Sequence, residues 1–169
     1  MFEQIFFYSL AIVSVGSALM VITHRNPVIA ALYLILNFFC LAGLYLTLHA
    51  QFIAVIQILV YAGAIMVLFL FVIMLLNLGD EEKLAEKISV RKILAAGLSA
   101  GVLMEILAIV GVGSASLPPG DLNKGIEIGT VEFIGKQMYT SYLFPFEVTS
   151  ILLLAAIVGA VILAKKKLD

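Results

Sequence analysis

Residues 26–79 read NPVIAALYLILNFFCLAGLYLTLHAQFIAVIQILVYAGAIMVLFLFVIMLLNLG and contain no Asp, Glu, Lys or Arg. A spanning helix needs about 20 apolar residues, so this stretch is long enough for two membrane crossings. A soluble core of this length would need charged side chains around it. The stretch therefore predicts a membrane protein, and its second half contains the segment on which the functional hypothesis rests.

The composition of the whole chain agrees with this prediction. Of the 169 residues 63% are hydrophobic and 12% are charged, whereas a soluble domain has roughly 25% charged residues. The net charge of −1 argues against nucleic-acid binding. The single cysteine, Cys40, excludes an internal disulfide, and His24 and His49 lie at opposite ends of one expected helix and cannot share a metal. We expect no catalytic, cofactor-binding or metal-binding residues on this chain.

Five apolar segments are each long enough to span a bilayer. They cover residues of about 5–22, 28–48, 52–76, 93–112 and 143–164. In lipid they must be helices, because a helix satisfies its own backbone hydrogen bonds. The predicted fold is therefore an all-α integral membrane protein with five transmembrane helices in a single domain, residues 1–169. The longest connection, 113–142, is too short for a soluble domain.

The positive charges predict an orientation. Because helix ends alternate between the two faces, one face receives eight cations: Arg25, Lys83, Lys87, Arg91, Lys92, Lys165, Lys166 and Lys167. The other face receives Lys124 and Lys136. Cytoplasmic loops are enriched in Lys and Arg, so we expect the N-terminus outside and the C-terminus in the cytoplasm.

The third segment has an unusual middle. Four residues at i, i+4, i+7 and i+11 would share one face of a regular helix: Gln57, Tyr61, Ala64 and Leu68. The 25 residues would form a helix about 38 Å long, against about 30 Å of hydrocarbon. Tilt absorbs this excess, and so does a π-bulge beside Gly63. Spacing alone favours close helix packing with Tyr61 hydrogen-bonded to a neighbour.

Two acidic residues lie in spanning segments. Glu105 is near the middle of the fourth segment, where a charge costs about 3 kcal/mol on insertion scales. It shares a face with a Gly-xxx-Gly pattern, so it is expected to be buried among helices, either as a proton relay or as a hydrogen-bonded acid. Glu147 begins the fifth segment, where the helix dipole favours an acid, and its face carries small residues that indicate a protein contact. Asn37 is expected to form an interhelical hydrogen bond.

Four stretches resemble one known family. The runs Asn26–Leu32, Phe38–Gly43 and Gln57–Phe69 are similar to subunit J of NADH:quinone oxidoreductase, respiratory complex I, whose mitochondrial relative is chain 6. Tyr142–Ser150 resembles the start of the family's fifth helix. The likeness covers essentially the whole chain, and the Tyr-Ala-Gly-Ala-Ile string is its most specific part.

The resemblance implies a function. It implies a membrane-arm subunit, in the inner (plasma) membrane of a bacterium, that couples quinone reduction to proton translocation. The expected partners are the lipid bilayer and membrane subunits of the A, H, K and N types. FMN, iron–sulfur clusters and quinone are expected in the assembled complex and not on this chain, which by itself is expected to be non-catalytic.

The resemblance also implies a coupling element. In the family the third helix can carry a π-bulge around the residues matching Tyr61–Gly63, and its switching is thought to open or close a hydrated path. Gln57, Met66 and Leu68 are then further coupling or gating residues. Because a bulge rotates every later side chain about the helix axis, Met66 and Leu68 would exchange between blocking and lining the path.

Three alternatives stay open. The chain could have the same role in a related complex that receives electrons from ferredoxin or another donor. It could be an independent small transporter, although five helices without an evident inverted repeat count against this. It could also be a structural scaffold, which would tolerate substitution of Tyr61 and Gly63.

Overall fold

The computed structural model describes residues 2–76, 90–113, 125 and 127–165, and the elements in these ranges are all helices. They are α1 (Phe2–Thr23), α2 (Pro27–Thr47), α3 (Gln51–Ile56), the π-helical segment η1 (Gln57–Ile65), α4 (Met66–Leu75), α5 (Val90–Gly113), α7 (Val131–Tyr139) and α8 (Leu143–Ala164). The elements α3, η1 and α4 form one continuous helix, Gln51–Leu75. Together with α1, α2, α5 and α8 it makes five helices that are long and apolar enough to cross a membrane. The all-α, five-span prediction is confirmed.

The helix ends follow local capping chemistry. Asn26 caps α2, because its side-chain oxygen accepts hydrogen bonds from the backbone N–H groups of Val28 (2.9 Å) and Ile29 (3.3 Å). Pro27 then occupies the first helical position, where its missing N–H has no consequence. The other spanning helices begin and end within three residues of the predicted limits.

One helix was not predicted. The range 113–142 was expected to be a connection, but it contains α7. The Thr130 hydroxyl caps α7 by accepting from the Phe133 N–H (3.2 Å), with Glu132 in the first turn and Lys136 in the last. Apolar run length detects spanning helices, and it does not detect a nine-residue helix with one apolar face.

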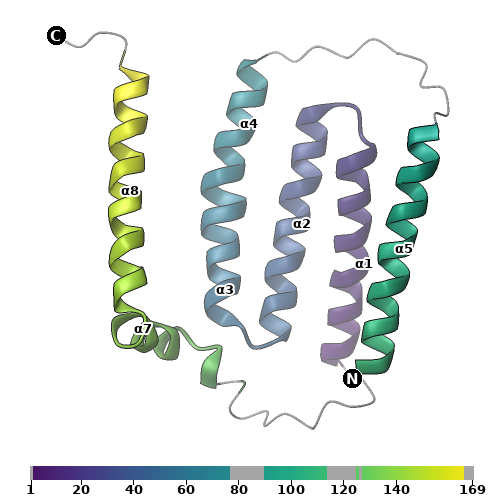
Figure 1. Cartoon of the computed structure of the whole chain (residues 1–169), viewed down its shortest axis with the longest axis horizontal. Coiled ribbons are helices and arrows are strands. Elements are labelled where there is room, and N and C mark those ends of the chain that lie inside the picture. Colours follow the sequence, from purple (N-terminus) through teal and green to yellow (C-terminus); the bar gives the residue numbers. More distant parts are fainter. Residues whose placement is uncertain (1, 77–89, 114–124, 126, 166–169) are drawn as a thin grey trace.

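Three of the five spanning helices pack together. Figure 1 shows α1, α2 and the α3–η1–α4 helix side by side, with α2 in contact with both neighbours. Their small core contains Ala31, Met66 and Ile73. Among the described residues α5 packs against no other helix and α8 packs only against α7, and no described side chain in the spanning part of either helix is buried. These two helices therefore present bare surfaces to lipid or to other proteins.

The helices alternate in direction, as the charge argument assumes. Figure 1 shows α8 finishing at the end of the molecule where α1 and α4 finish, and α1 beginning at the opposite end. Arg25, which follows α1, and Lys165, which follows α8, therefore lie at the same end.

Labelling of single cysteines tests which end is cytoplasmic. In a Cys40→Ala background, cysteines placed at Lys136 and at Lys165 are expected to react with a membrane-impermeant maleimide from opposite sides of sealed vesicles. Lys165 should react from the cytoplasmic side, because it lies on the cation-rich face. Reaction of both positions from one side would contradict the five-span topology.

Candidate coupling site in the third spanning helix

The middle of the third spanning helix is π-helical over nine residues, Gln57–Ile65. At its end the Met66 N–H bonds to the carbonyl of Tyr61, five residues earlier, instead of four as in an α-helix. The π-bulge that the family resemblance implied for this helix is therefore present. It covers Gln57, Tyr61 and Gly63, whereas Met66 and Leu68 follow it in α4.

The spacing of the buried residues in this helix contains one residue more than a regular α-helix would have. These residues are Ala54, Gln57, Ala62, Met66 and Ile73, so the steps between them are three, five, four and seven residues. Steps of three, four and seven keep side chains on one face of an α-helix, and a step of five does not. The step of five falls inside η1, where the wider turn keeps Ala62 and Met66 on the face that packs against α2.

The predicted site residues consequently separate into two groups. Gln57 and Met66 are buried, with 8% and 4% of their surface exposed, whereas Tyr61 is 45% and Leu68 is 65% exposed. The prediction that Gln57, Tyr61 and Leu68 share one face is wrong, because it assumed 3.6 residues per turn throughout. The Tyr61 ring instead makes an edge contact with Phe38 on α2, at 5.9 Å between ring centroids.

Gly63 sits where the π-helical backbone leaves little room. A Cβ at this position would lie 3.1 Å from the carbonyl oxygen of Ile58, which is tighter than most real contacts. Glycine avoids this contact, and a larger residue at position 63 fits the π form only if the Ile58 carbonyl shifts by a few tenths of an ångström.

Gln57 is a largely buried residue, but its polar side-chain atoms are not fully enclosed. Its side chain forms no hydrogen bond within the part of the chain that the structure describes. Because its polar atoms remain accessible, the amide can bind a water molecule or a group from another protein.

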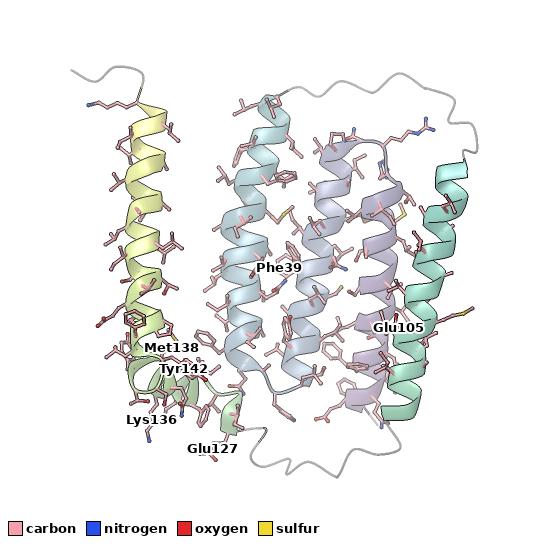
Figure 2. The ribbon with its side chains drawn as sticks, viewed as in Figure 1. Phe39, Glu105, Glu127, Lys136, Met138 and Tyr142 are labelled. Carbon is pink, nitrogen blue, oxygen red and sulfur yellow. The ribbon has the colours of Figure 1, made fainter. Side chains whose placement is uncertain are left out.

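The two acidic candidates lie away from η1. Glu105 is exposed midway along α5 (Figure 2), because α5 packs against none of the described helices, so its expected burial among helices stays a prediction about contacts with partner subunits. Glu147 is exposed on α8, which begins at Leu143, so this acid lies beyond the first turn where the dipole acts. The structure therefore brings neither acid to the π-helical segment.

A polar cluster joins α1 to α2. The side-chain N–H₂ of Asn37 donates to the carbonyl oxygen of Ser14 (2.7 Å), the hydroxyl of Ser14 (3.0 Å) and the hydroxyl of Ser17 (3.2 Å). The expected interhelical role of Asn37 is confirmed. The serine partners were missed, although two serines three residues apart on one face of an apolar helix are a signal for such a contact.

Replacing Asn37 with leucine is expected to weaken the α1–α2 contact. The change removes the donors and leaves two buried hydroxyls facing an apolar side chain, at a cost of about 1–2 kcal/mol. We expect a lower melting temperature of the purified protein assembly, measured by loss of native fluorescence. Asn37→Gln, which keeps the amide, should recover part of the loss. Equal stability of Asn37→Leu and the natural chain would show that the cluster contributes nothing.

These features define a multi-span helical membrane protein whose third spanning helix is π-helical at its centre. The sequence profile of NADH-ubiquinone/plastoquinone oxidoreductase chain 6 matches residues 17–163 of this chain. The chain belongs to this family.

Individual relatives agree with this assignment. The chain is 38% identical over 166 residues to NAD(P)H-quinone oxidoreductase subunit 6 from the organellar chromatophore of Paulinella chromatophora, covering 98% of this chain and 80% of that protein. It is 37% identical over 158 residues to NADH-quinone oxidoreductase subunit J of Escherichia coli K12, covering 91% and 82%. The resemblance found in the sequence is confirmed.

Proposed function

We propose that this chain is a membrane-arm subunit of a proton-translocating quinone oxidoreductase, and that its π-helical segment couples quinone reduction to proton translocation. Family membership supports the first part, and it counts against an independent small transporter. The relatives' names differ in the nicotinamide donor, NADH or NAD(P)H, and share the quinone. The proposed role concerns the reduction of quinone, which both names specify.

The five-residue step between Gln57 and Ala62 carries the coupling proposal. If η1 converted to a regular α-helix, every residue after it would turn by about 100° relative to the residues before it. The buried positions would then pass from Ala62 to Tyr61 and from Met66 to Ile65. A change of hydrogen-bond register would thus replace Ala62 at the buried centre of the α2 contact by Tyr61, which in the π form touches α2 only through an edge contact with Phe38.

The residues of the segment fit such a switch. Gly63 accepts the π-helical backbone without a Cβ contact, and Gln57 offers an accessible amide that can bind a water molecule. In the π form Met66 occupies the core and Leu68 points out of it. Conversion to the α form would move the exposed Leu68 toward the α2 contact and Met66 away from it, which would open or close a hydrated path beside Gln57.

The bare helices support a location inside a larger membrane complex. The exposed faces of α5 and α8 have the composition of helix-packing surfaces, and membrane subunits of the A, H, K and N types are the proposed partners. The proposed location is the inner (plasma) membrane of a bacterium, with the C-terminus in the cytoplasm. FMN, iron–sulfur clusters and quinone are proposed to be held by the partners.

Co-purification tests this assignment. An affinity-tagged copy of the chain, expressed in its own host and extracted in a mild detergent, should bring down a large assembly that contains flavin and iron and oxidises NADH or NADPH with a quinone. The tagged chain purified without partners should contain none of these groups. Isolation of the chain alone from gently extracted membranes would contradict the proposal.

Glu105→Gln tests the two roles of the acid on α5. Glutamine keeps the shape and the hydrogen-bonding capacity of the side chain but cannot hold a charge. We expect normal assembly and unchanged proton translocation in sealed vesicles, because the acid is far from η1 and a partner helix would use it as a hydrogen-bonding group. Loss of translocation with normal assembly would instead identify Glu105 as a proton relay.

A further inference from the structure

An apolar pocket lies where the end of α2 and the start of α3 face α7. Its volume is about 440 Å³, which falls within the range of roughly 300–1,000 Å³ seen for small-molecule sites. Most of its lining is apolar, and the side chains that matter here are Leu48, Ile53, Phe133, Ile134, Met138 and Tyr142. None of them belongs to η1, so this pocket is distinct from the proposed coupling site.

A close backbone contact fixes the two walls of the pocket. A Cβ on Gly129, just before α7, would overlap the carbonyl oxygen of His49. His49 lies in the turn between α2 and α3 and has a left-handed φ of 60°. The Ala50 N–H closes this turn on the carbonyl of Tyr45 (2.9 Å). Because Gly129 touches the turn directly, the spacing between the two walls is set by backbone atoms.

The pocket lies at the level where spanning helices end. The second spanning helix finishes at Thr47, the third begins at Gln51 and the last begins at Leu143. Tyrosines are enriched at this depth, and Tyr139 and Tyr142 lie here. The pocket therefore spans the boundary between the hydrocarbon and the headgroups of one leaflet.

The short helix α7 is amphipathic in the way that suits this boundary. Phe133, Ile134 and Met138 are partly buried on the pocket side, whereas Glu132 and Lys136 are exposed. Figure 2 shows Lys136 on the outer side of this end of the molecule, and Met138 and Tyr142 nearer the spanning helices. A helix with these two faces lies in the interface plane, with its charges among the headgroups.

We propose that this pocket holds one acyl chain of a phospholipid whose headgroup phosphate lies at Lys136. The apolar lining excludes a charged metabolite, and within the described residues the Lys136 ammonium has no carboxylate partner. Glu132, one turn earlier on the same exposed face, can accept a hydrogen bond from the amine of an ethanolamine headgroup. Beyond the pocket the acyl chain would continue along the exposed apolar side chains of α8, which contacts neither α3 nor η1.

Photolabelling of the intact complex tests this site. The complex is reconstituted into phosphatidylethanolamine vesicles that contain a phosphatidylethanolamine with a diazirine in its acyl chain. After illumination, we expect label on the α7 peptide and near Ile53. Met138→Trp and Ile53→Trp fill the pocket from opposite walls, and each should lower this labelling severalfold. Val131→Trp, on the exposed side of α7, is the matched control and should leave it unchanged.

A second probe tests the headgroup contact. Lys136→Gln should weaken labelling by the phospholipid probe and should not change labelling by a diacylglycerol probe, which lacks the phosphate. Three results would overturn the proposal: equal labelling in the filled and control variants, crosslinks from position 138 to another subunit in place of lipid, or preferential labelling of these peptides by a photoactivatable quinone.

Discussion

Gly63→Leu is expected to abolish quinone-linked turnover and proton translocation together, while the complex still assembles. The Cβ of leucine would lie 3.1 Å from the Ile58 carbonyl oxygen in the π form, so the substitution favours the α form. A bias of about 1.4 kcal/mol toward the α form would change the ratio of the two states about tenfold. NADH oxidation by an artificial acceptor should continue, because that reaction does not require the membrane step.

Gly16 supplies the matched control for this substitution. It also lies within a spanning helix, but a Cβ on Gly16 would meet nothing within 4 Å. Gly16→Leu should therefore keep coupled turnover, and Gly63→Ala should fall between the natural chain and Gly63→Leu. Full coupled turnover in an assembled Gly63→Leu enzyme would show that the segment has only a packing role. This result would favour the scaffold alternative.

Deletion of Leu59 is expected to abolish quinone-linked turnover as Gly63→Leu does, because it removes the extra residue of the π-helical segment. Leu59 is exposed and lies between Gln57 and Ala62, so its removal changes the buried steps from three, five, four and seven to three, four, four and seven. This pattern suits an uninterrupted α-helix. The shortened helix keeps its core contacts and loses the extra residue that the π form requires. We expect normal amounts of assembled complex with no quinone-linked turnover.

Deletion of Phe71 is the control for the deletion of Leu59. Phe71 is similarly exposed, but it lies in regular α-helix between Met66 and Ile73. Its removal would turn Ile73 out of the core by about 100°, so less complex should assemble. The amount of complex on a native gel, compared between the two deletions, separates loss of switching from loss of packing. Similar amounts of assembled complex in the two deletion variants would show that η1 does not contain an extra residue that can be removed without loss of packing.

The spanning helices could be predicted from the sequence because the bilayer imposes their length and polarity. The absence of charge from residues 26–79 requires burial in lipid, and the Asn26–Pro27 pair marks a helix start by local chemistry alone. The helix α7 obeys neither rule, because it is short and half polar. Its position depends on the contact between Gly129 and the His49 turn, which joins residues far apart in the sequence.

The proposed coupling segment was only partly predictable. Helical spacing singled out Gln57, Tyr61 and Leu68, the family resemblance supplied their expected role, and the helix length was compatible with a π-bulge. Which of them face the core depends on where the extra residue lies, and a pattern with 3.6 residues per turn assigns Tyr61 to the wrong face. For Glu105 the surroundings are set by α5, whose neighbours are not supplied by the described part of this chain.

The exposed surfaces of α5 and α8 have a consequence for the steady-state amount of this protein in the cell. Within the described residues three spanning helices pack against one another, and α5 and α8 pack against no other spanning helix, so we expect their contacts to come from partner subunits. The folding free energy of the complete chain is then inseparable from assembly. Copies made in excess of their partners would remain substrates for membrane proteases, so the steady-state abundance of the chain would follow the supply of its partners and not its own rate of synthesis.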